Sequence, residues 1–274
     1  MDPVAFSFNG LEIRWYGIFT ALAFIVGYLT VRYRIRQYKV ENPASYEQLV
    51  FWGLIGGIIG ARLLYVFQYW EHFAGDLLEI FRIDHGGLVF QGGLIGAFAL
   101  GLLIAGINKA GIRLALDIFA PALALAHAVG RIGCFLNGCC FGEPYRGPLA
   151  VQYPAGSPAS YVQRELGIIP DTIGAIPEAV FPIQLVASAG NLIIFFLLLL
   201  LQRRLKVKGQ LFAMYVMLYS VIRFTVEFGR GDYLDSSAGL TPAQSVGMVL
   251  FPLALLAFIG LQKFRSRAVQ AGDR

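Results

Sequence analysis

Apolar residues in this 274-residue chain fall into long blocks with few charges, and short polar stretches separate the blocks. Each block approaches the roughly 20 residues that a helix needs to cross the hydrocarbon core of a bilayer. We therefore expect an all-α polytopic membrane protein that forms one seven-helix domain over residues 1–274. The seven predicted spans are residues 15–32, 49–69, 87–107, 114–130, 183–201, 210–228 and 243–262.

The charged residues are distributed unevenly between the two sides of these helices. Most of the 22 lysines and arginines lie in the loops after the first, third and fifth helices and in the C-terminal tail, whereas the opposite loops hold most of the acidic residues. Cytoplasmic loops of membrane proteins are enriched in Lys and Arg, so we expect the N-terminus outside the cytoplasm and the C-terminus inside it. The first apolar segment lacks a basic n-region and a cleavage site, and we interpret it as a retained helix.

One stretch, residues 143–182, interrupts the pattern of apolar blocks. It contains seven prolines and mixed charges, and no apolar run in it is long enough to span a bilayer. Prolines at this density favour loops and short elements. We expect a small, loop-rich head or lid on the extracytoplasmic side, inserted within the membrane domain.

Composition excludes several classes of protein. With 57% hydrophobic and only 14% charged residues, the chain lies outside the range of soluble domains. The net charge of +5 reflects the loop asymmetry and attraction to anionic lipid, and no patterned aromatic and basic stretch indicates nucleic-acid binding. The motifs of phosphate-binding loops, α/β-hydrolases and zincins are absent from the sequence.

The segment GRIGCFLNGCCFG, residues 130–142, places Arg131 and Asn137 where a predicted helix gives way to a turn rich in glycine and cysteine. Exposing a guanidinium to hydrocarbon costs roughly 2.5 to 3.5 kcal/mol, so an intramembrane arginine usually faces a partner, a cavity or a substrate. Arg131 is therefore the first candidate functional residue.

A second charged group lies in the sixth predicted helix. Tyr219, Arg223 and Glu227 recur at four-residue spacing, and Arg230 follows three residues later, so we expect all four on one helical face. One interpretation is a structural ion pair between Arg223 and Glu227. The other is an anion site, because two arginines and one glutamate leave a positive charge over.

Histidine and cysteine residues accompany Arg131. His127 lies four residues before it on the same predicted helix, where either a packed core position or a functional role would fit. Cys134, Cys139 and Cys140 are too few and too close for a disulfide framework. They do not form a CxxC pair, and we expect adjacent cysteines to have difficulty reaching one tetrahedral ion. The sequence therefore predicts no metal site, and we interpret the thiols as structural.

Two further segments carry candidate chemistry near the outer membrane boundary. In HGGLVFQGGLIG, residues 85–96, paired glycines permit close backbone approach, and His85 is either a base or an ordinary loop residue. In IRWYG, residues 13–17, Trp15 and Tyr16 are either interfacial anchors or part of a site. Small residues at four-residue spacing also favour close helix packing in the second and third predicted helices, at Gly53 and Gly57, Gly56 and Gly60, and Gly92 and Gly96.

Together with GARLLYV at residues 60–66 and YSVIRFTVEFGR at residues 219–230, these segments resemble the phosphatidylglycerol:prolipoprotein diacylglyceryl transferases of bacterial inner membranes. The resemblance covers most of the chain in order, and the Gly-Arg-x-Gly-x-Phe-x-Asn-Gly run is its specific signature. It implies a seven-helix fold with the site toward the periplasmic face. It also implies transfer of a diacylglyceryl group from phosphatidylglycerol to the lipobox cysteine of a preprolipoprotein, with release of glycerol 1-phosphate.

The resemblance further implies roles for individual residues. The catalytic candidates are Arg131, Arg223, Tyr16 and His85. The candidate phosphatidylglycerol-binding residues are Arg131, Asn137, Gly138, Gly142, Tyr219, Glu227, Arg230 and Gln91. The chain departs from the family pattern with Cys134 in place of Asn, Cys139 in place of Glu and Gln91 in place of His, and of the usual fifth-helix motif it keeps Pro182, Gln184 and Leu185. Since glutamine cannot act as a base, His85 is a substitute candidate.

Displacement at a glycerol carbon by a thiol needs a thiolate and a stabilised phosphate leaving group. We assign Arg131 to the phosphoglycerol headgroup, Arg223 to the developing negative charge and Arg230 to the periplasmic rim, because a guanidinium fork binds phosphate bidentately. His85 or Tyr16 could relay the thiol proton. Because the lipid is itself the activated donor, we expect no metal or organic cofactor.

Two other classes of function fit the sequence less well. An anion channel would place polar residues along the full depth of several helices, whereas here they gather in the outer half. A purely structural membrane subunit would leave the surplus of arginines unexplained.

Overall fold

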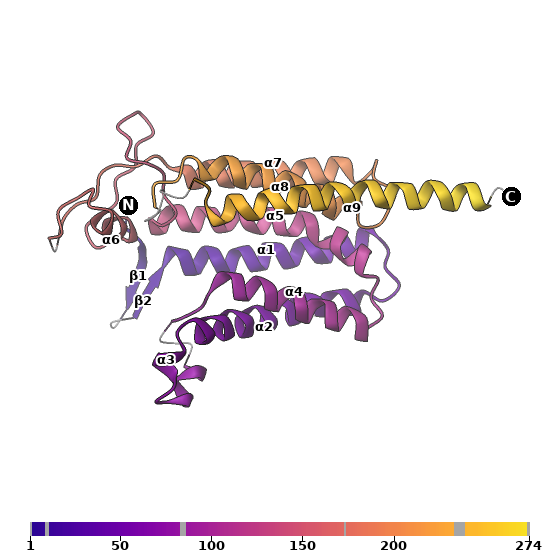
Figure 1. The fold of residues 1–274 in the computed structure, drawn as a ribbon, viewed down its shortest axis with the longest axis horizontal. Coiled ribbons are helices and arrows are strands. Elements are labelled where there is room, and N and C mark those ends of the chain that lie inside the picture. The colour runs from indigo at the N-terminus through magenta and orange to yellow at the C-terminus, as the bar shows by residue number, and fades with distance from the viewer. Residues whose placement is uncertain (1, 9–10, 83–85, 173, 233–238, 273–274) are drawn as a thin grey trace. The chain divides into compact units, whose positions relative to one another are not determined.

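The computed structural model describes the chain except for residues 1, 9–10, 83–85, 173, 233–238 and 273–274. The described residues contain seven helices of at least 18 residues (Figure 1). These are α1 (Trp15–Gln37), α2 (Pro43–Gln68), α4 (Phe90–Ile107), α5 (Ile112–Asn137), α7 (Ile183–Leu201), α8 (Gln210–Glu227) and α9 (Pro242–Gly272). Five of them, α1, α2, α5, α7 and α9, are long and apolar enough to cross a membrane. The helical class is confirmed, and the helices indicate a multi-pass membrane protein.

The end of α5 differs from the prediction. The predicted helix 114–130 continues to Asn137, so Arg131 lies within the helix and not at its end. The helix stops where Gly138 adopts a left-handed conformation with a φ of 75°. Glycine reaches this conformation at a helix terminus without steric strain.

The end of α8 also changes the expected arrangement of charges. The helix ends at Glu227, so Arg230 lies beyond it and does not continue the helical face of Tyr219 and Arg223. Arg230 instead forms an isolated antiparallel bridge with Gly142. The expectation that all four residues share one helical face is therefore wrong for Arg230.

One small sheet adds to the helical prediction. Strands β1 (Val4–Phe8) and β2 (Leu11–Arg14) form an antiparallel hairpin before α1. The Asn9-Gly10 dipeptide between the two runs is a signal typical of hairpins that could have indicated it. The remaining short elements are α3 (Trp70–Phe73), η1 (Leu77–Phe81) and α6 (Pro158–Glu165).

The segment 143–182 has the short elements that its prolines predict. It contains α6, and Val180 bridges to both Pro144 and Val151. Tyr153, Ala159 and Val180 of this segment form a small core with Phe141 of the preceding turn. The Tyr153 hydroxyl donates to the carbonyl of Phe135 at 2.8 Å, which ties the segment to the end of α5.

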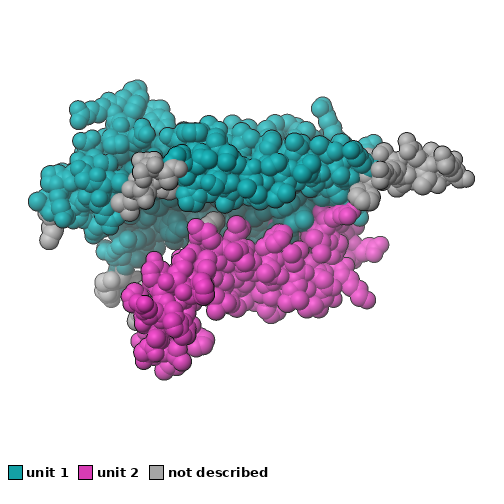
Figure 2. Space-filling model, in the orientation of Figure 1, with its two compact units in different colours: residues 1–30, 116–274 teal, residues 31–115 magenta. Residues whose placement is uncertain are grey.

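The described chain forms two compact units, shown in separate colours in Figure 2. Residues 31–115 make up the smaller one, in which α2 packs on α4 through glycines as predicted. A methyl group at Gly60 would collide with the carbonyl of Gly92, and one at Gly96 with the carbonyl of Gly56. The absence of side chains at these positions lets the two helix backbones touch.

Arg62 is a buried arginine of this smaller unit, and its role is structural. Its guanidinium donates to the carbonyls of Ile80 at 2.8 Å, Gly86 at 2.7 Å and Arg82 at 3.1 Å. Backbone oxygens thus compensate the desolvation of the guanidinium and hold the segment after α3 against α2.

The larger unit consists of residues 1–30 and 116–274. The carboxylate of Asp117 on α5 accepts the backbone N–H groups of Gly209 at 2.6 Å and Phe212 at 2.9 Å, at the positive N-terminal end of α8. On α7, the Ser188 hydroxyl donates to the carbonyl of Ala128 at 2.7 Å. These bonds fix α7 and α8 against α5, and all three helices contribute to the candidate site.

Candidate functional site

Arg131 lines a small cavity between three helices of the larger unit. Tyr219 and Arg223 from α8 and Asn191 from α7 face the same space. Its volume is about 10 Å³, which is room for about one water molecule.

The guanidinium of Arg131 makes no hydrogen bond or ion pair with any residue that the structure describes. The buried guanidinium of Arg62, in contrast, donates to several backbone carbonyls. An arginine at membrane depth without a compensating carboxylate or carbonyl favours an anionic ligand. This property distinguishes Arg131 from the other arginines near the site.

Glu227 is the carboxylate around which the remaining charges are arranged. Its side chain is fully buried, forms an ion pair with Arg223 and lies 3.6 Å from the Arg230 guanidinium. The Thr241 hydroxyl, from the segment before α9, donates to its other oxygen at 2.8 Å. Arg230 also pairs with Asp232 at 2.6 Å. Arg223 and Glu227 therefore form the ion pair expected from their four-residue spacing, and the alternative of an anion site on this face stays a prediction.

Tyr219 is the aromatic residue among those that line the cavity, and two further rings stack on it. Tyr219 stacks on His127 with ring centroids 5.1 Å apart and an interplanar angle of 17°. Tyr215 stacks on the same tyrosine at 5.8 Å. His127 thus lies in the second layer behind Tyr219, in a packed position on α5.

Glycines shape the turn that follows α5. A methyl group at Gly138 would come within 2.9 Å of the Tyr153 ring, and one at Gly142 within 2.6 Å of the Phe181 carbonyl. The N–H of Gly231 donates to the carbonyl of Phe141 at 3.0 Å, beside the bridge of Gly142 with Arg230. Close backbone approach at Gly142 and Gly231 joins the segment after α8 to the turn.

Asn137 and Tyr16 lie at the edge of this arrangement. Asn137 is the last residue of α5, and its half-buried side chain makes no hydrogen bond with the described residues. Tyr16 is 47% exposed, near the start of α1. A methyl group at Gly133 would lie 3.7 Å from the Tyr16 Cα, so the start of α1 packs on the last turns of α5.

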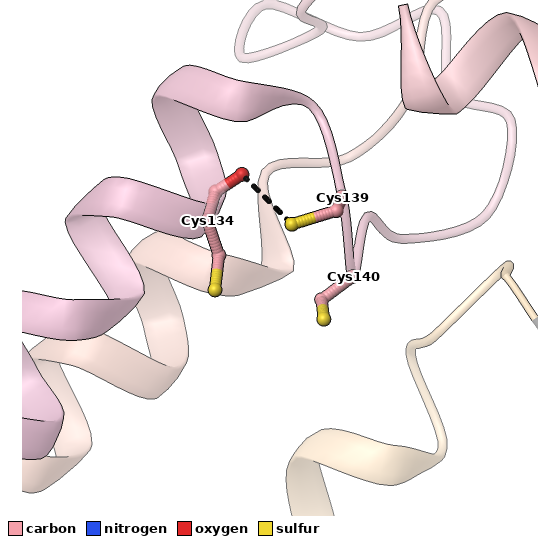
Figure 3. Close-up of side chains that lie close together, drawn as sticks. All are labelled: Cys134, Cys139 and Cys140. Atoms are coloured by element: carbon pink, nitrogen blue, oxygen red, sulfur yellow. Dashed lines mark hydrogen bonds between the residues drawn. The ribbon is translucent and has the colours of Figure 1, made fainter. Parts of the chain in front are cut away.

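The sulfur atoms of Cys134, Cys139 and Cys140 lie within 4.8 Å of one another, and none is in a disulfide (Figure 3). The Cys139 thiol donates to the carbonyl of Cys134 at 3.8 Å. Interactions with the thiols of Cys134 and Cys139, followed by the charges of Arg230 and Arg131, lower the pKa of the Cys140 thiol. The three sulfurs therefore lie close together, although adjacent cysteines were expected to have difficulty reaching one tetrahedral ion.

His85 and Gln91 are the two predicted site residues from the segment 85–96. His85 lies outside the described residues, and Gln91 is the second residue of α4 in the smaller unit. Their catalytic and lipid-binding roles stay predictions.

Asn191 and Thr241 are residues that the sequence reasoning missed. Asn191 is 3% exposed; its amide nitrogen donates to the Ala187 carbonyl at 2.8 Å, whereas its buried oxygen has no partner among the described residues. A polar residue in the middle of an apolar helix was the available signal. Nothing local to Thr241 indicates its contact with Glu227.

Comparisons with known proteins extend this picture to the whole chain. A family model described as prolipoprotein diacylglyceryl transferase matches residues 3–260. The chain is 33% identical over 278 residues to the phosphatidylglycerol–prolipoprotein diacylglyceryl transferase of Finegoldia magna, covering 100% of both proteins. It is 33% identical over 272 residues to the protein of the same name from Dehalococcoides mccartyi, covering 98% of this chain and 96% of the relative. The corresponding Bordetella bronchiseptica protein is 32% identical over 271 residues, covering 97% and 96%.

Proposed function

Because the chain belongs to the prolipoprotein diacylglyceryl transferase family, we propose that it transfers the diacylglyceryl group of phosphatidylglycerol to the lipobox cysteine of preprolipoproteins. In this reaction the thiolate forms a thioether with a glycerol carbon, the carbon–oxygen bond to phosphate breaks, and glycerol 1-phosphate leaves. The product is the first intermediate of lipoprotein maturation.

The unpaired guanidinium of Arg131 is the observation that carries our assignment of the site. Its planar fork can donate two parallel hydrogen bonds to one phosphate, and such charge-assisted bonds are roughly twice as strong as neutral ones. Within the described residues, this guanidinium forms no hydrogen bond or ion pair that a phosphate would have to replace.

We assign the other charged residues to supporting roles. Arg223 lines the same cavity and stabilises the phosphate as negative charge develops on the leaving group. Glu227 holds Arg223 and Arg230 in place, and Arg230 marks the periplasmic rim. Tyr16 and His85 remain the candidates for relaying the thiol proton, whereas Gln91 has no basic nitrogen.

We further propose that all seven long helices span a bacterial inner membrane. The N-terminus and the segment 143–182 then face the periplasm, and the basic C-terminal tail faces the cytoplasm. The distribution of lysines and arginines supports this orientation. It places Arg131 and the turn after α5 at the periplasmic side, where lipobox signal peptides emerge from the bilayer.

The test is direct incubation of the purified protein with phosphatidylglycerol and a lipobox peptide. We expect the peptide to gain the mass of a diacylglyceryl group, with release of glycerol 1-phosphate. A peptide with serine in place of the lipobox cysteine is the matched control and should remain unmodified. Absence of the mass gain, while membranes containing active enzyme modify the same peptide, would refute the proposed function.

A further inference from the structure

The three cysteines after Arg131 converge because of the backbone between them. Cys134 extends from the last turn of α5, whereas Cys139 and Cys140 belong to the turn that follows the helix (Figure 3). Neighbouring side chains in an extended segment point to opposite sides. Cys140 has a φ of 56°, a left-handed conformation that costs a non-glycine residue about 1–3 kcal/mol. The backbone is therefore not extended at Cys140, and the side chains of Cys139 and Cys140 do not have to point to opposite sides.

Hydrogen bonds hold this conformation in place. The amide of Gln184 on α7 donates to the carbonyl of Cys139 at 2.9 Å, and the N–H of Cys139 donates to the carbonyl of Cys134 at 3.2 Å. Gln184 is 1% exposed, so this support comes from the packed interior. The three thiols are therefore gathered by a folded turn and not by chance at a surface.

We propose that Cys134, Cys139 and Cys140 bind one Zn²⁺ ion as three thiolates. Zinc–sulfur bonds of about 2.3 Å in a tetrahedral site separate the sulfurs by about 3.8 Å. The sulfurs here lie within 4.8 Å of one another, so rotations of the three side chains suffice to close the site. The Cys139 thiol then exchanges its weak hydrogen bond to the Cys134 carbonyl for a metal bond.

The charges around the cluster fit such a site. Three thiolates and Zn²⁺ carry a net charge of −1, which must be compensated at membrane depth. Arg131 and Arg230 both lie close enough to Cys140 to interact with it electrostatically. The arginine that we assign to the phosphate is thus also a neighbour of the metal site.

The cluster provides three ligands, and no His, Asp or Glu among the described residues joins it. Three protein ligands with an open fourth position are typical of catalytic zinc, whereas structural zinc is closed by four. We assign the fourth position to the lipobox thiol of the substrate, an assignment that rests on the proposed function. A thiol that binds a metal loses its proton, here to water, and so becomes the required thiolate. Its sulfur then bonds to the glycerol carbon as the carbon–oxygen bond breaks, the electron pair leaves with the phosphate, and the thioether dissociates.

Metal binding by the full-length protein tests the site without relying on activity. Reduced, metal-free protein in detergent should take up one Zn²⁺ per chain in competition with a chromophoric chelator. Cys134→Ser and Cys139→Ser should each weaken binding by at least about 100-fold, because each removes a ligand. His72→Ala, at an exposed histidine in the smaller unit, is the control and should bind as the unaltered protein does. Binding that survives the cysteine substitutions, or that His72→Ala removes, would overturn the proposal.

Co²⁺ in place of Zn²⁺ reports on the fourth ligand. The loaded protein should show the sulfur-to-cobalt charge-transfer absorption of a thiolate site, and a lipobox peptide should change its visible bands. The same peptide with serine in place of cysteine should leave the bands unchanged. An identical response to both peptides would overturn the role of the substrate thiol.

The two proposals fail separately. Lipid transfer by protein that binds no metal would refute the zinc site and leave the proposed function standing. One Zn²⁺ per chain in protein that never modifies the peptide would support the site and refute the function.

Discussion

At the scale of single residues, the three arginines near the candidate site differ in whether a carboxylate pairs with them. Arg223 and Arg230 share the carboxylate of Glu227, and Arg230 also pairs with Asp232. Arg131 has neither kind of partner among the described residues. Pairing satisfies a buried charge permanently, whereas an unpaired guanidinium remains available to an anion.

Arg131→Lys tests this distinction, since it keeps the charge and removes the planar fork. We expect the protein to fold and its specific activity to fall by more than about tenfold, or about 1.4 kcal/mol in transition-state stabilisation. The measurement is diacylglyceryl transfer normalised to folded protein, together with phosphatidylglycerol affinity. Arg146→Lys is the matched control, because the Arg146 side chain is 91% exposed, and it should change neither quantity. If Arg131→Lys leaves both the transfer activity and the phosphatidylglycerol affinity nearly unchanged, Arg131 is not part of the site.

At the scale of elements, the site depends on how α5, α7 and α8 are held together. Asp117 on α5 binds the N-terminal end of α8, and Ser188 on α7 binds α5. Glu227 at the end of α8 accepts a hydrogen bond from Thr241, which lies in the segment that leads into α9. The polar groups inside the unit therefore connect helices that are far apart in sequence.

Glu227→Gln should destabilise this junction, because it leaves two arginines short of a buried carboxylate. We expect the free energy of unfolding to fall by about 3 kcal/mol, in the range found when one partner of a buried ion pair is removed. Denaturant titration in detergent measures this change. Glu178→Gln, which affects an exposed pair with Arg146 at 4.0 Å, should cost less than about 1 kcal/mol. Equal effects of the two substitutions would contradict the role of Glu227.

The contact between α2 and α4 can be tested with two glycines of one helix. Gly60→Ala should reduce the thermal stability, since its methyl group would meet the backbone of Gly92, and overpacking of this kind costs about 1–3 kcal/mol. At Gly53 a methyl group would meet nothing within 4 Å. Gly53→Ala should therefore be neutral or stabilising, because alanine favours the helix by up to about 1 kcal/mol. Equal loss of stability in both variants would exclude close packing at Gly60.

At the scale of the whole molecule, exposed apolar surface agrees with a bilayer environment. Phe196 and Leu200 on α7 and Leu256 on α9 are between 55% and 69% exposed. In water such surface would be a liability, whereas lipid tails solvate it. Together with the five helices that are long enough to cross a membrane, these faces indicate lipid contact along the helices.

The proposed orientation predicts which loops face the outside of the cell. In a variant that lacks the three native cysteines, Ala155→Cys should react with a membrane-impermeant thiol reagent in intact cells. Lys206→Cys should react only after the membrane is permeabilised. Both positions are exposed, so burial within the protein does not explain a difference between them. The reverse pattern would place the turn after α5 on the cytoplasmic side.

Much of the fold and part of the site were predictable. The bounds of α7 match the predicted 183–201, because an uninterrupted apolar run there follows Pro182. The predicted end of α5 is too early, because the apolar run stops at the polar Arg131 whereas the backbone stays helical to Asn137. The Arg223–Glu227 pair was foreseeable from its four-residue spacing, since such residues are neighbours on a helix.

The sequence by itself determined the helical membrane class, the approximate helices and the family, because apolar block length and an unbroken signature are local properties of the chain. Only the tertiary structure decided which arginine lacks a partner, since the carboxylates that pair with its neighbours come from α8 and the residues after it. It also decided that the sulfur of Cys134 on α5 lies close to those of Cys139 and Cys140 in the following turn. That convergence depends on a left-handed backbone at Cys140 and on a hydrogen bond from Gln184, 45 residues from Cys139, and no local pattern encodes either.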